Sequence, residues 1–240
     1  MKRIDKRELN ELRKLKLKLG VSRHAEGSCL ITAGNTEVLC TASIDESVPR
    51  FLKGKGKGWV TAEYAMLPMS CNQRIPRDGS RGKANARSLE IQRLIGRALR
   101  SIVDMKALGE RTIWLDCDVL QGDGGTRCAA ITGAYIALHK ACLGLKKKKL
   151  IDAWPLRDFV GAVSVGVVEG KPMLDLCYEE DSNADVDMNV IMTGDGRFVE
   201  IQGTAEKEPF DEKTMNQLLS LGKLGIKQLI AAQKKVLKIK

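Results

Sequence analysis

The spacing of hydrophobic residues along the chain predicts strands in some segments and helices in others. Period-two alternation places successive side chains on opposite faces and is typical of a strand. In residues 14–19 lysine takes every second position, which predicts an edge strand with one basic face. Turn residues at 33–35 join two further segments into a hairpin. The strands expected in the first part of the chain are 14–19, the hairpin 27–43, 59–62 and 112–121.

Helical spacing of hydrophobic residues predicts three long helices. In residues 86–103 the apolar side chains recur on one face, while three arginines lie on the other. Residues 128–141 are rich in alanine and β-branched residues, and residues 212–237 are amphipathic. The rest of the second half predicts two strand pairs, 159–168 with 171–178 and 187–192 with 197–202.

A lysine-rich segment with a proline, 144–157, separates two similar successions of elements. Its four consecutive lysines indicate a solvated connector. On each side of this segment, hairpins come first and a helix follows. We therefore expect an α+β fold with two layers related by pseudo-symmetry, 1–143 and 150–240, whose sheets are covered by helices. The whole chain, 1–240, then forms a single unit.

Composition argues against several classes of protein. Of the 240 residues, 43% are hydrophobic and 29% are charged, as in an ordinary globular chain. No apolar run approaches the ~18 residues that cross a bilayer, and the basic N-terminal segment lacks the apolar stretch of a secretory signal. The seven cysteines form no C-x-x-C pair and the two histidines lie far apart, which predicts reduced thiols and no local zinc site. We expect a cytoplasmic protein without a membrane partner.

Positive charge is concentrated in the first hundred residues. They hold 21 basic and 10 acidic side chains, whereas residues 101–240 hold 19 and 20. Such an excess is typical either of a surface that faces a polyanion or of a solubilising surface. Residues 168–200 have the opposite character, with nine carboxylates against Lys171 and Arg197.

The loop 122–127, Gly-Asp-Gly-Gly-Thr-Arg, lies between a predicted strand and a predicted helix. A helix that opens in this way presents unpaired amides, and its dipole adds positive potential, so anions bind at such ends. The glycines permit close approach, Thr126 offers a hydroxyl, and Arg127 offers a forked cation for phosphate oxygens. Neither the Walker A pattern nor the dinucleotide pattern is present. A phosphate site and an ordinary left-handed turn both fit the loop.

The acidic segment places Asp181 and Asp187 six residues apart, with Asp175, Glu180 and Asp185 nearby. Carboxylate oxygens are ligands that Mg²⁺ prefers, usually together with substrate phosphates. Alternatively, one carboxylate acts as a general acid toward a leaving ribose hydroxyl. On spacing alone, a solvated acidic loop fits slightly better than a metal or catalytic site.

Several long motifs occur together in one order. Taken together they resemble the ribonuclease PH family of phosphate-dependent 3′ exoribonucleases over nearly the whole chain. The motifs are HAEGSCL from His24, VPRFLKGKGKGWVTAEYAMLP at 48–68, RGKANARSLEIQRLIGRALR at 81–100, DCDVLQGDGGTRCAAITGA at 116–134, YEEDSNADVDMNVIMTGDGRFVEIQGTAE at 178–206 and EPF at 208–210.

The resemblance implies two βαββαβ-type layers and a homohexameric ring built as a trimer of dimers. It implies that inorganic phosphate, the co-substrate, attacks the terminal phosphodiester of an RNA with a free 3′ end and releases a nucleoside diphosphate. Precursors of transfer RNA are the main implied substrates, among other RNAs that include ribosomal RNA. The implied phosphate-binding residues are Arg87, Gly125, Thr126 and Arg127. Asp181 and Asp187 are implied as the catalytic pair and as ligands of Mg²⁺. The implied RNA-binding residues are Arg74, Arg77, Arg81 and Lys83.

One departure from the family pattern concerns backbone geometry. The family's N-terminal Arg-Pro-Asp-Gly-Arg is Arg3-Ile4-Asp5-Lys6-Arg7 here. The main alternative function is a non-catalytic RNA-binding ring subunit of an exosome-like assembly, which is expected to have lost the arginines or aspartates of the centre. A hydrolytic nuclease is a second alternative, and it would release monophosphates without added phosphate.

Overall fold

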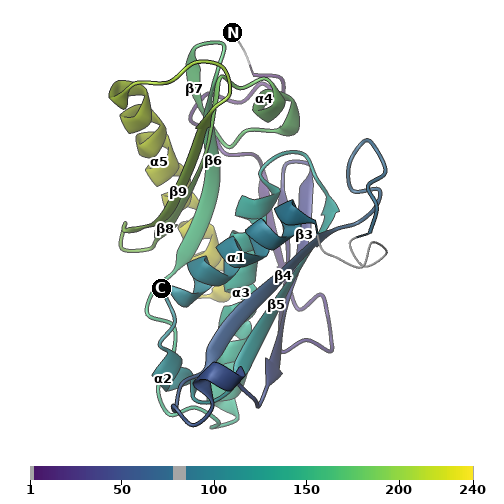
Figure 1. Ribbon diagram of the computed structural model, residues 1–240, viewed down its shortest axis with the longest axis vertical. Coiled ribbons are helices and arrows are strands. Elements are labelled where there is room, and N and C mark those ends of the chain that lie inside the picture. Colours follow the sequence, from purple (N-terminus) through teal and green to yellow (C-terminus); the bar gives the residue numbers. More distant parts are fainter. Residues whose placement is uncertain (1–2, 78–84, 240) are drawn as a thin grey trace.

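The structure of the protein, a computed structural model, describes residues 3–77 and 85–239. Two sheets lie on either side of a central helix, and further helices cover them (Figure 1). A five-stranded sheet has the order β1-β2-β3-β5-β4, and a four-stranded sheet has the order β7-β6-β8-β9. The expected α+β fold, with two sheets covered by helices, is confirmed.

The sheet of the first half brings three functional segments to one edge. Strand β4 runs parallel to β5, and helices α1 and α2 form the crossover that such a pair needs. Because parallel strands end at the same edge, the loop after β4, the start of α1 and the loop 122–127 gather there. The other neighbouring strands are antiparallel. The elements are β1 (Leu15–Leu19), β2 (Gly27–Ala33), β3 (Thr36–Asp45), the short η1 (Arg50–Leu52), β4 (Trp59–Met66), α1 (Ala86–Arg100), α2 (Met105–Leu108) and β5 (Thr112–Gln121).

Helix α3 (Thr126–Lys147) lies between the two sheets. It packs against β2, β3 and β5 on one side and against β6 on the other, so most of its length is buried. By length and composition it could cross a membrane, with a mean hydropathy of 1.4 over 18 residues, but 83% of that window is buried inside the protein. This helix corrects the expectation that no apolar run approaches that length, and packing in the core accounts for its composition.

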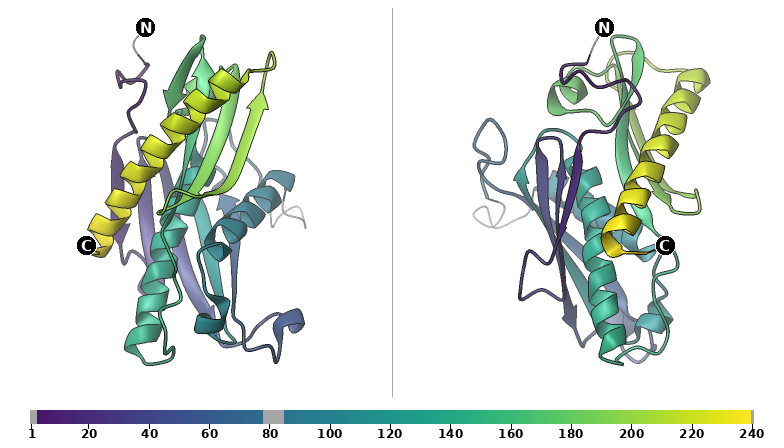
Figure 2. Two further views of the ribbon diagram at one scale, coloured as in Figure 1. Left: turned by 90° about the vertical axis from the view of Figure 1, so that its left-hand side faces the viewer. Right: turned by 180° about the vertical axis from the view of Figure 1, so that it is seen from behind.

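Two helices, α3 and α5, enclose the sheet of the second half. Strand β6 is buried at all nine positions because α3 and α5 both pack against it, and its sequence is accordingly an almost continuous apolar run. Figure 2 shows α5 crossing this sheet, and the helix also contacts β1 of the first sheet. The elements are β6 (Val160–Val168), β7 (Lys171–Leu174), α4 (Tyr178–Ser182), β8 (Val186–Thr193), β9 (Phe198–Ala205) and α5 (Glu212–Leu237).

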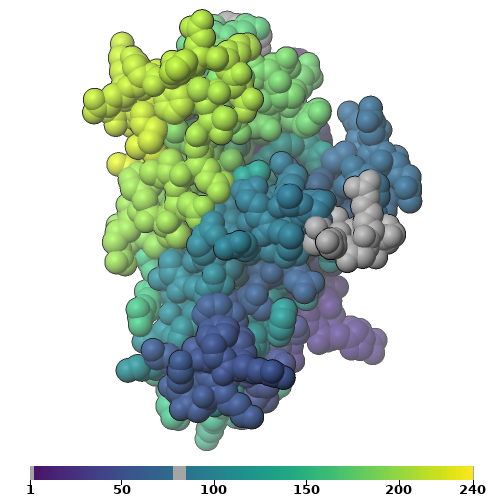
Figure 3. All heavy atoms as spheres, in the orientation of Figure 1, coloured from purple at the N-terminus to yellow at the C-terminus, as the bar shows by residue number. Residues whose placement is uncertain are grey.

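The two halves share a core. Its main cluster joins Ile131 of α3 to Val160 and Ala162 of β6, and it includes Ile191 of β8. On the face seen in Figure 3, atoms of the second half occupy the upper part and atoms of the first half the lower part. Each half contributes one sheet; the first half supplies the long helices α1 and α3, and the second supplies α5.

Two differences from the predicted elements lie close together in space. The strand expected at 171–178 ends at Leu174, because Asp175 has a left-handed φ of 55° and the short helix α4 follows. The strand expected at 59–62 continues to Met66, which pairs with Val119. Both changes supply residues to the edge of the sheet where the loop 122–127 lies.

The N-terminal segment takes a strained backbone at the point where it departs from the family pattern. Lys6, which stands where the family has glycine, has a φ of 66°. Glycine adopts this left-handed region freely, whereas a residue with a Cβ is strained there. The arginines on either side are anchored: Arg3 donates to the Glu180 carboxylate at 2.6 Å and Arg7 to the Asp5 carboxylate at 2.6 Å. These bonds hold the turn in spite of the lysine.

Candidate active site

A cavity of about 950 Å³ opens at the edge where these segments meet. The loop after β4, the first turn of α1, the loop 122–127 and α4 all contribute to its walls. The residues of greatest chemical interest that line it are Tyr64, Arg77, Arg87, Gly125, Thr126, Tyr178 and Asp181. Side chains distant in sequence therefore face one space.

The loop 122–127 ends as an open helix terminus. Helix α3 begins at Thr126, and its N-cap residue, Gly125, has a left-handed φ of 62° and provides no capping side chain. The Thr126 hydroxyl lies 2.9 Å from the Tyr64 hydroxyl, which fixes its orientation at the cavity wall. The first amides of a 22-residue helix are thus left for another acceptor, which is the arrangement that binds phosphate.

Glycine is required at two positions of this loop by its neighbours. A Cβ on Gly124 would lie 2.7 Å from the backbone of Leu176 and Cys177, just before α4. A Cβ on Gly125 would lie 2.8 Å from Nη2 of Arg13. Both glycines also have positive φ. The loop is therefore pressed directly against the segment that carries Asp181.

Two arginines flank the open end of α3. Arg87 lies in the first turn of α1, whose N-cap Asn85 accepts a hydrogen bond from the Ser88 amide at 2.8 Å. Arg127 is held from two sides, because its Nη1 donates to Glu90 at 3.1 Å and to Gln202 at 3.0 Å. Arg87 lines the cavity directly, whereas Arg127 lies beside it.

The paired aspartates come from α4 and β8, and both are partly buried. Burial raises the pKa of Asp181, and the charge of Asp187 raises it further against the opposing effect of Arg87 and Arg127. Burial also raises the pKa of Asp187, with a contribution from Glu206, while Arg127 lowers it. Neither carboxylate forms an ion pair within the described ranges 3–77 and 85–239. These are the properties of groups that exchange protons or bind a cation.

The same two carboxylates suit a divalent cation only in part. Within the described part of the chain, no group of three or more histidine, cysteine, aspartate or glutamate side chains is placed to hold a metal ion. Asp181 and Asp187 would supply two oxygen ligands, and phosphate oxygens or water would have to complete the shell. Burial and neighbouring carboxylates raise the pKa values of both groups, and a bound cation would oppose that effect.

The described part of the loop after β4, residues 67–77, projects from the side of the molecule (Figure 1). Arg77 lines the cavity, while Arg74 is exposed on the same loop and does not line it. Arg81 and Lys83 lie outside the described residues. The structure thus brings one member of this predicted group to the cavity.

The three carboxylates named above as near the pair, Asp175, Glu180 and Asp185, are engaged elsewhere. Asp185 pairs with Lys207 on the surface at 2.6 Å, and Glu180 is buried against Arg3. Asp175 is buried against Arg13, with Nη2 of the arginine 2.7 Å from Oδ1. The sequence did not distinguish these three from Asp187 or from Asp181, which lines the cavity.

Two residues of the site were missed by the sequence analysis. Arg13 is buried and donates to the Asp123 carbonyl in the loop at 2.5 Å, but its ion-pair partner is 162 residues away and no local pattern indicated it. Tyr178 is 58% exposed and lines the cavity. An aromatic residue immediately before an acidic run was the available signal.

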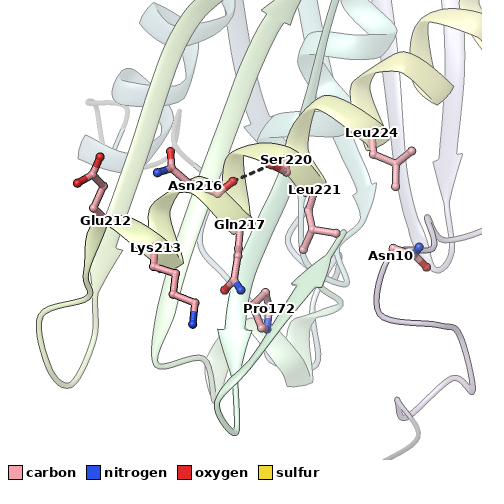
Figure 4. A pocket seen from close by; sticks show the side chains of 9 residues that line it. All are labelled: Asn10, Pro172, Glu212, Lys213, Asn216, Gln217, Ser220, Leu221 and Leu224. Carbon is pink, nitrogen blue, oxygen red and sulfur yellow. Dashed lines mark hydrogen bonds between the residues drawn. The ribbon is translucent and has the colours of Figure 1, made fainter.

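A second hollow, of about 900 Å³, lies beside the first half of α5, with Pro172 of β7 and Asn10 also lining it (Figure 4). Its charged lining side chains are Glu212 and Lys213, and most of the others are carboxamides or aliphatic groups such as Asn216, Gln217 and Leu221. It does not combine a helix terminus with paired carboxylates, so the first cavity is the candidate active site.

The fold and this cavity define an enzyme of the phosphoryl-transfer class, in which an open helix terminus and the Asp181 carboxyl face one space. The chain belongs to the 3′ exoribonuclease family. Domain 1 of the family matches residues 11–143, and domain 2 matches residues 158–225.

Curated relatives match the chain almost from end to end. It is 56% identical over 235 residues to a ribonuclease PH of Bacillus pumilus (strain SAFR-032), which covers 98% of this chain and 97% of that protein. It is 54% identical over 237 residues to a ribonuclease PH of Syntrophomonas wolfei subsp. wolfei (strain DSM 2245B / Goettingen), with 99% of each covered.

Solved structures of lower identity share the fold. A chain from an Archaeoglobus fulgidus exosome with RNA bound to the active site superposes with a TM-score of 0.81 at 24% identity, covering 96% of this chain and 92% of that chain. Rice (Oryza sativa) Rrp46 superposes with a TM-score of 0.80 at 18% identity, covering 98% and 100%. At these identities the likeness concerns the fold alone.

Proposed function

We infer that this chain is a phosphorolytic 3′-to-5′ exoribonuclease, a phosphate-dependent nucleotidyltransferase. One observation carries the inference: the uncapped start of α3 and the Asp181 carboxyl face the same cavity. The identity of 54–56% to two ribonuclease PH proteins over nearly the full length supports it. A non-catalytic ring subunit is not favoured, because Arg87, Arg127, Asp181 and Asp187 are all present.

The reaction exchanges one phosphorus–oxygen bond for another. An oxygen of inorganic phosphate forms a bond to the phosphorus of the last phosphodiester, and the bond from that phosphorus to the 3′ oxygen of the preceding nucleotide breaks. The 3′ oxygen takes up a proton, and the terminal nucleotide leaves as a nucleoside diphosphate. Both reactants are anions, so positioning and charge neutralisation dominate the catalysis.

The attacking phosphate is bound by the open end of α3 and its flanking arginines. The amides after Gly125, the Thr126 hydroxyl and the guanidinium groups of Arg87 and Arg127 provide donors of the required kind. Tyr64 holds the Thr126 hydroxyl, and Glu90 and Gln202 hold Arg127. The seat is therefore organised before phosphate arrives.

The proton for the leaving 3′ oxygen comes from the aspartate pair. The raised pKa of Asp181 favours its acid form, which a general acid needs. In the alternative role, the ionised carboxylates of Asp181 and Asp187 would hold Mg²⁺, which when bound would neutralise charge on the reacting phosphates. Arg127 acts on the charge of both aspartates and so couples the phosphate seat to them.

The RNA strand enters past the loop after β4. Arg77 at the cavity and exposed Arg74 would contact its backbone, and we assign the same role to Arg81 and Lys83 from the motif alone. Contacts with phosphates give salt-dependent binding with little sequence readout. Transfer RNA precursors and other RNAs with free 3′ ends are the proposed substrates.

We further propose a cytoplasmic homohexameric ring, a trimer of dimers. Similarity of fold to chains of an archaeal exosome core supports ring assembly, and seven free cysteines, six of them buried, support a reducing location. The halves 1–143 and 150–240 act as one unit in this proposal, supported by the core they share.

One assay tests the function. RNA with a free 3′ end is incubated with the protein and Mg²⁺, with and without inorganic phosphate, and the products are separated by chromatography. Nucleoside diphosphates that form only with phosphate are the expected result. Nucleoside monophosphates in both reactions would show hydrolysis instead, and unchanged RNA in both would favour the non-catalytic alternative.

A further inference from the structure

The loop that seats phosphate contains a carboxylate, Asp123, that the reaction as described does not use. A negative charge in an anion-binding loop opposes binding unless its side chain is directed elsewhere. Oδ1 of Asp123 accepts a hydrogen bond from the Tyr178 amide at 3.1 Å, and Oδ2 accepts one from Nδ2 of Asn35 at 3.1 Å. The side chain is thus committed to two bonds within the protein.

The first of these bonds reaches the helix that carries the catalytic aspartate. Tyr178 is the first residue of α4, and Asp181 lies one turn further along, with its own amide bonded to the Cys177 carbonyl at 2.9 Å. Residues three apart lie on the same side of a helix. A displacement of the Tyr178 amide therefore displaces the Asp181 carboxyl.

A buried connection runs parallel to this exposed one. Arg13 donates to the Asp123 carbonyl and, through Nη2, to Asp175, three residues before the start of α4. Its own amide also donates to Asp175 at 2.8 Å. Between the two connections the backbone of Gly124 lies against residues 176–178 without room for a Cβ. The phosphate loop and the start of α4 are consequently fastened at two points.

We propose that Asp123 is a positioning residue, whose carboxylate ties the phosphate loop to α4 and so sets the place of the Asp181 carboxyl relative to the bound phosphate. Arg13 forms the buried connection between the same two segments and keeps the fold intact when Asp123 is changed. The proposal rests on the proposed function and adds a distance-setting role to it.

The test uses the full-length protein and steady-state kinetics with RNA and phosphate. Asp123→Ala removes the tie and is expected to lower kcat about tenfold, while KM for phosphate and for RNA changes less than about threefold. Asp123→Asn keeps an oxygen acceptor for the Tyr178 amide and is expected to retain kcat within about threefold of the wild type. Asn35→Ala, which removes an equally long bond to the same carboxylate without touching α4, is the matched control and should stay within about twofold.

A double variant separates positioning from other roles. If Asp123 acts through Asp181, the effect of Asp123→Ala largely disappears in an Asp181→Asn background. Multiplied losses in the double variant would overturn the proposal, as would a raised KM for phosphate at unchanged kcat. Equal loss in Asp123→Asn and Asp123→Ala would show that the charge matters rather than the tie. An inactive wild type would reject the proposed function instead, which keeps the two failures distinct.

Discussion

Two pairs of carboxylates in the segment 175–187 have pKa values shifted in opposite directions. The structural pair is Asp175 and Glu180, and the reactive pair is Asp181 and Asp187. Burial alone would raise the pKa of Asp175 and of Glu180, but Arg13 outweighs this effect for the first and Arg3 for the second, so both pKa values are lowered. Asp181 and Asp187 are also partly buried, yet they have no arginine within ion-pair distance in the described chain, and their pKa values are raised.

The comparison separates structural from reactive carboxylates by their partners rather than by their burial. A carboxylate bonded to a guanidinium is held ionised and gives up its freedom to exchange a proton. One that faces a cavity with only distant positive charge keeps an accessible proton. The two pairs are at most twelve residues apart in sequence, so local composition alone does not reveal which is which.

The largest expected effect follows from changing the reactive pair. Asp181→Asn should lower kcat by roughly 10²–10⁴-fold, the range for loss of a general acid, because the amide cannot donate the required proton. Thermal stability should be unchanged or higher, because the raised pKa of Asp181 means that its charge disfavours the folded state at neutral pH. Steady-state rates and calorimetric melting measure the two effects.

The matched control is Asp185→Asn. It removes the same charge four residues away, but Asp185 lies on the surface against Lys207. Its kcat should stay within about twofold of the wild type. Equal losses in the two variants would mean that the acidity of the whole segment matters, and the distinction between the pairs would fail.

Changing Asp175 of the structural pair should lower the free energy of unfolding by nearly as much as Asp181→Asn raises the free-energy barrier of the reaction. Asp175→Asn leaves the buried Arg13 without its counter-ion, and breaking such a pair from one side costs about 3–5 kcal/mol of unfolding free energy. The lowered pKa of Asp175 means that its stabilisation is present at neutral pH and is lost as pH falls through the acid range. Urea unfolding at neutral and acidic pH measures both.

Asp195→Asn serves as the control for this effect. Asp195 pairs with Arg197 at 2.7 Å, as closely as Asp175 does with Arg13, but on the surface. Little change in the unfolding midpoint is expected, since exposed pairs contribute little. A large loss of unfolding free energy in Asp195→Asn would show that burial does not explain the effect of Asp175→Asn.

The pH dependence of turnover gives a smaller and more specific effect. If the acid form of Asp181 protonates the leaving oxygen, kcat at saturating phosphate falls about tenfold per pH unit above the raised pKa of this group. Measuring kcat against pH in wild type and in Asp185→Asn, where the profile should not move, checks this. A rate that rises with pH over the same interval would assign the pair to cation binding alone.

The smallest expected effect concerns the turn that holds Arg3 and Arg7. Lys6→Gly should raise the free energy of unfolding by about 0.5 kcal/mol, because relief of roughly 1–2 kcal/mol of left-handed strain exceeds the added entropy of glycine in the unfolded chain. Lys53→Gly, at an exposed residue with a φ of −57°, should instead be neutral or slightly destabilising. Chemical unfolding of both variants decides whether the strain is real.

The period of hydrophobic residues along the sequence was sufficient to predict most of the helices and strands. The strand 112–121 was predicted with the bounds that Thr112–Gln121 has, and the helix at 86–103 corresponds to Ala86–Arg100. The end of β7 was missed, because the left-handed backbone of Asp175 depends on its bonds to Arg13, a contact across 162 residues. The parallel pairing of β4 with β5 is likewise a long-range property that no local period reports.

The candidate site likewise contains some residues that a local sequence signal indicated and others that depend on long-range contacts. The loop 122–127 was identified from its residues, because an open helix terminus is a local feature. Arg87 required the family resemblance, since nothing in its own helix marks it as facing that loop. Arg13 and Tyr178 were overlooked, and Asp123 was named only as part of the loop, because the bonds among these segments form only when distant parts of the chain meet. Their roles remain predictions until the variants are measured.

The central position of α3 has a consequence for synthesis of the chain. The face of α3 that packs on β6 is covered by residues that leave the ribosome later than the helix itself. Until they emerge, the nascent first half displays an apolar helix with no partner on that side, a surface that chaperones recognise and that promotes aggregation. The core around α3, the helix whose first turn seats phosphate, can therefore form completely only after β6 has left the ribosome.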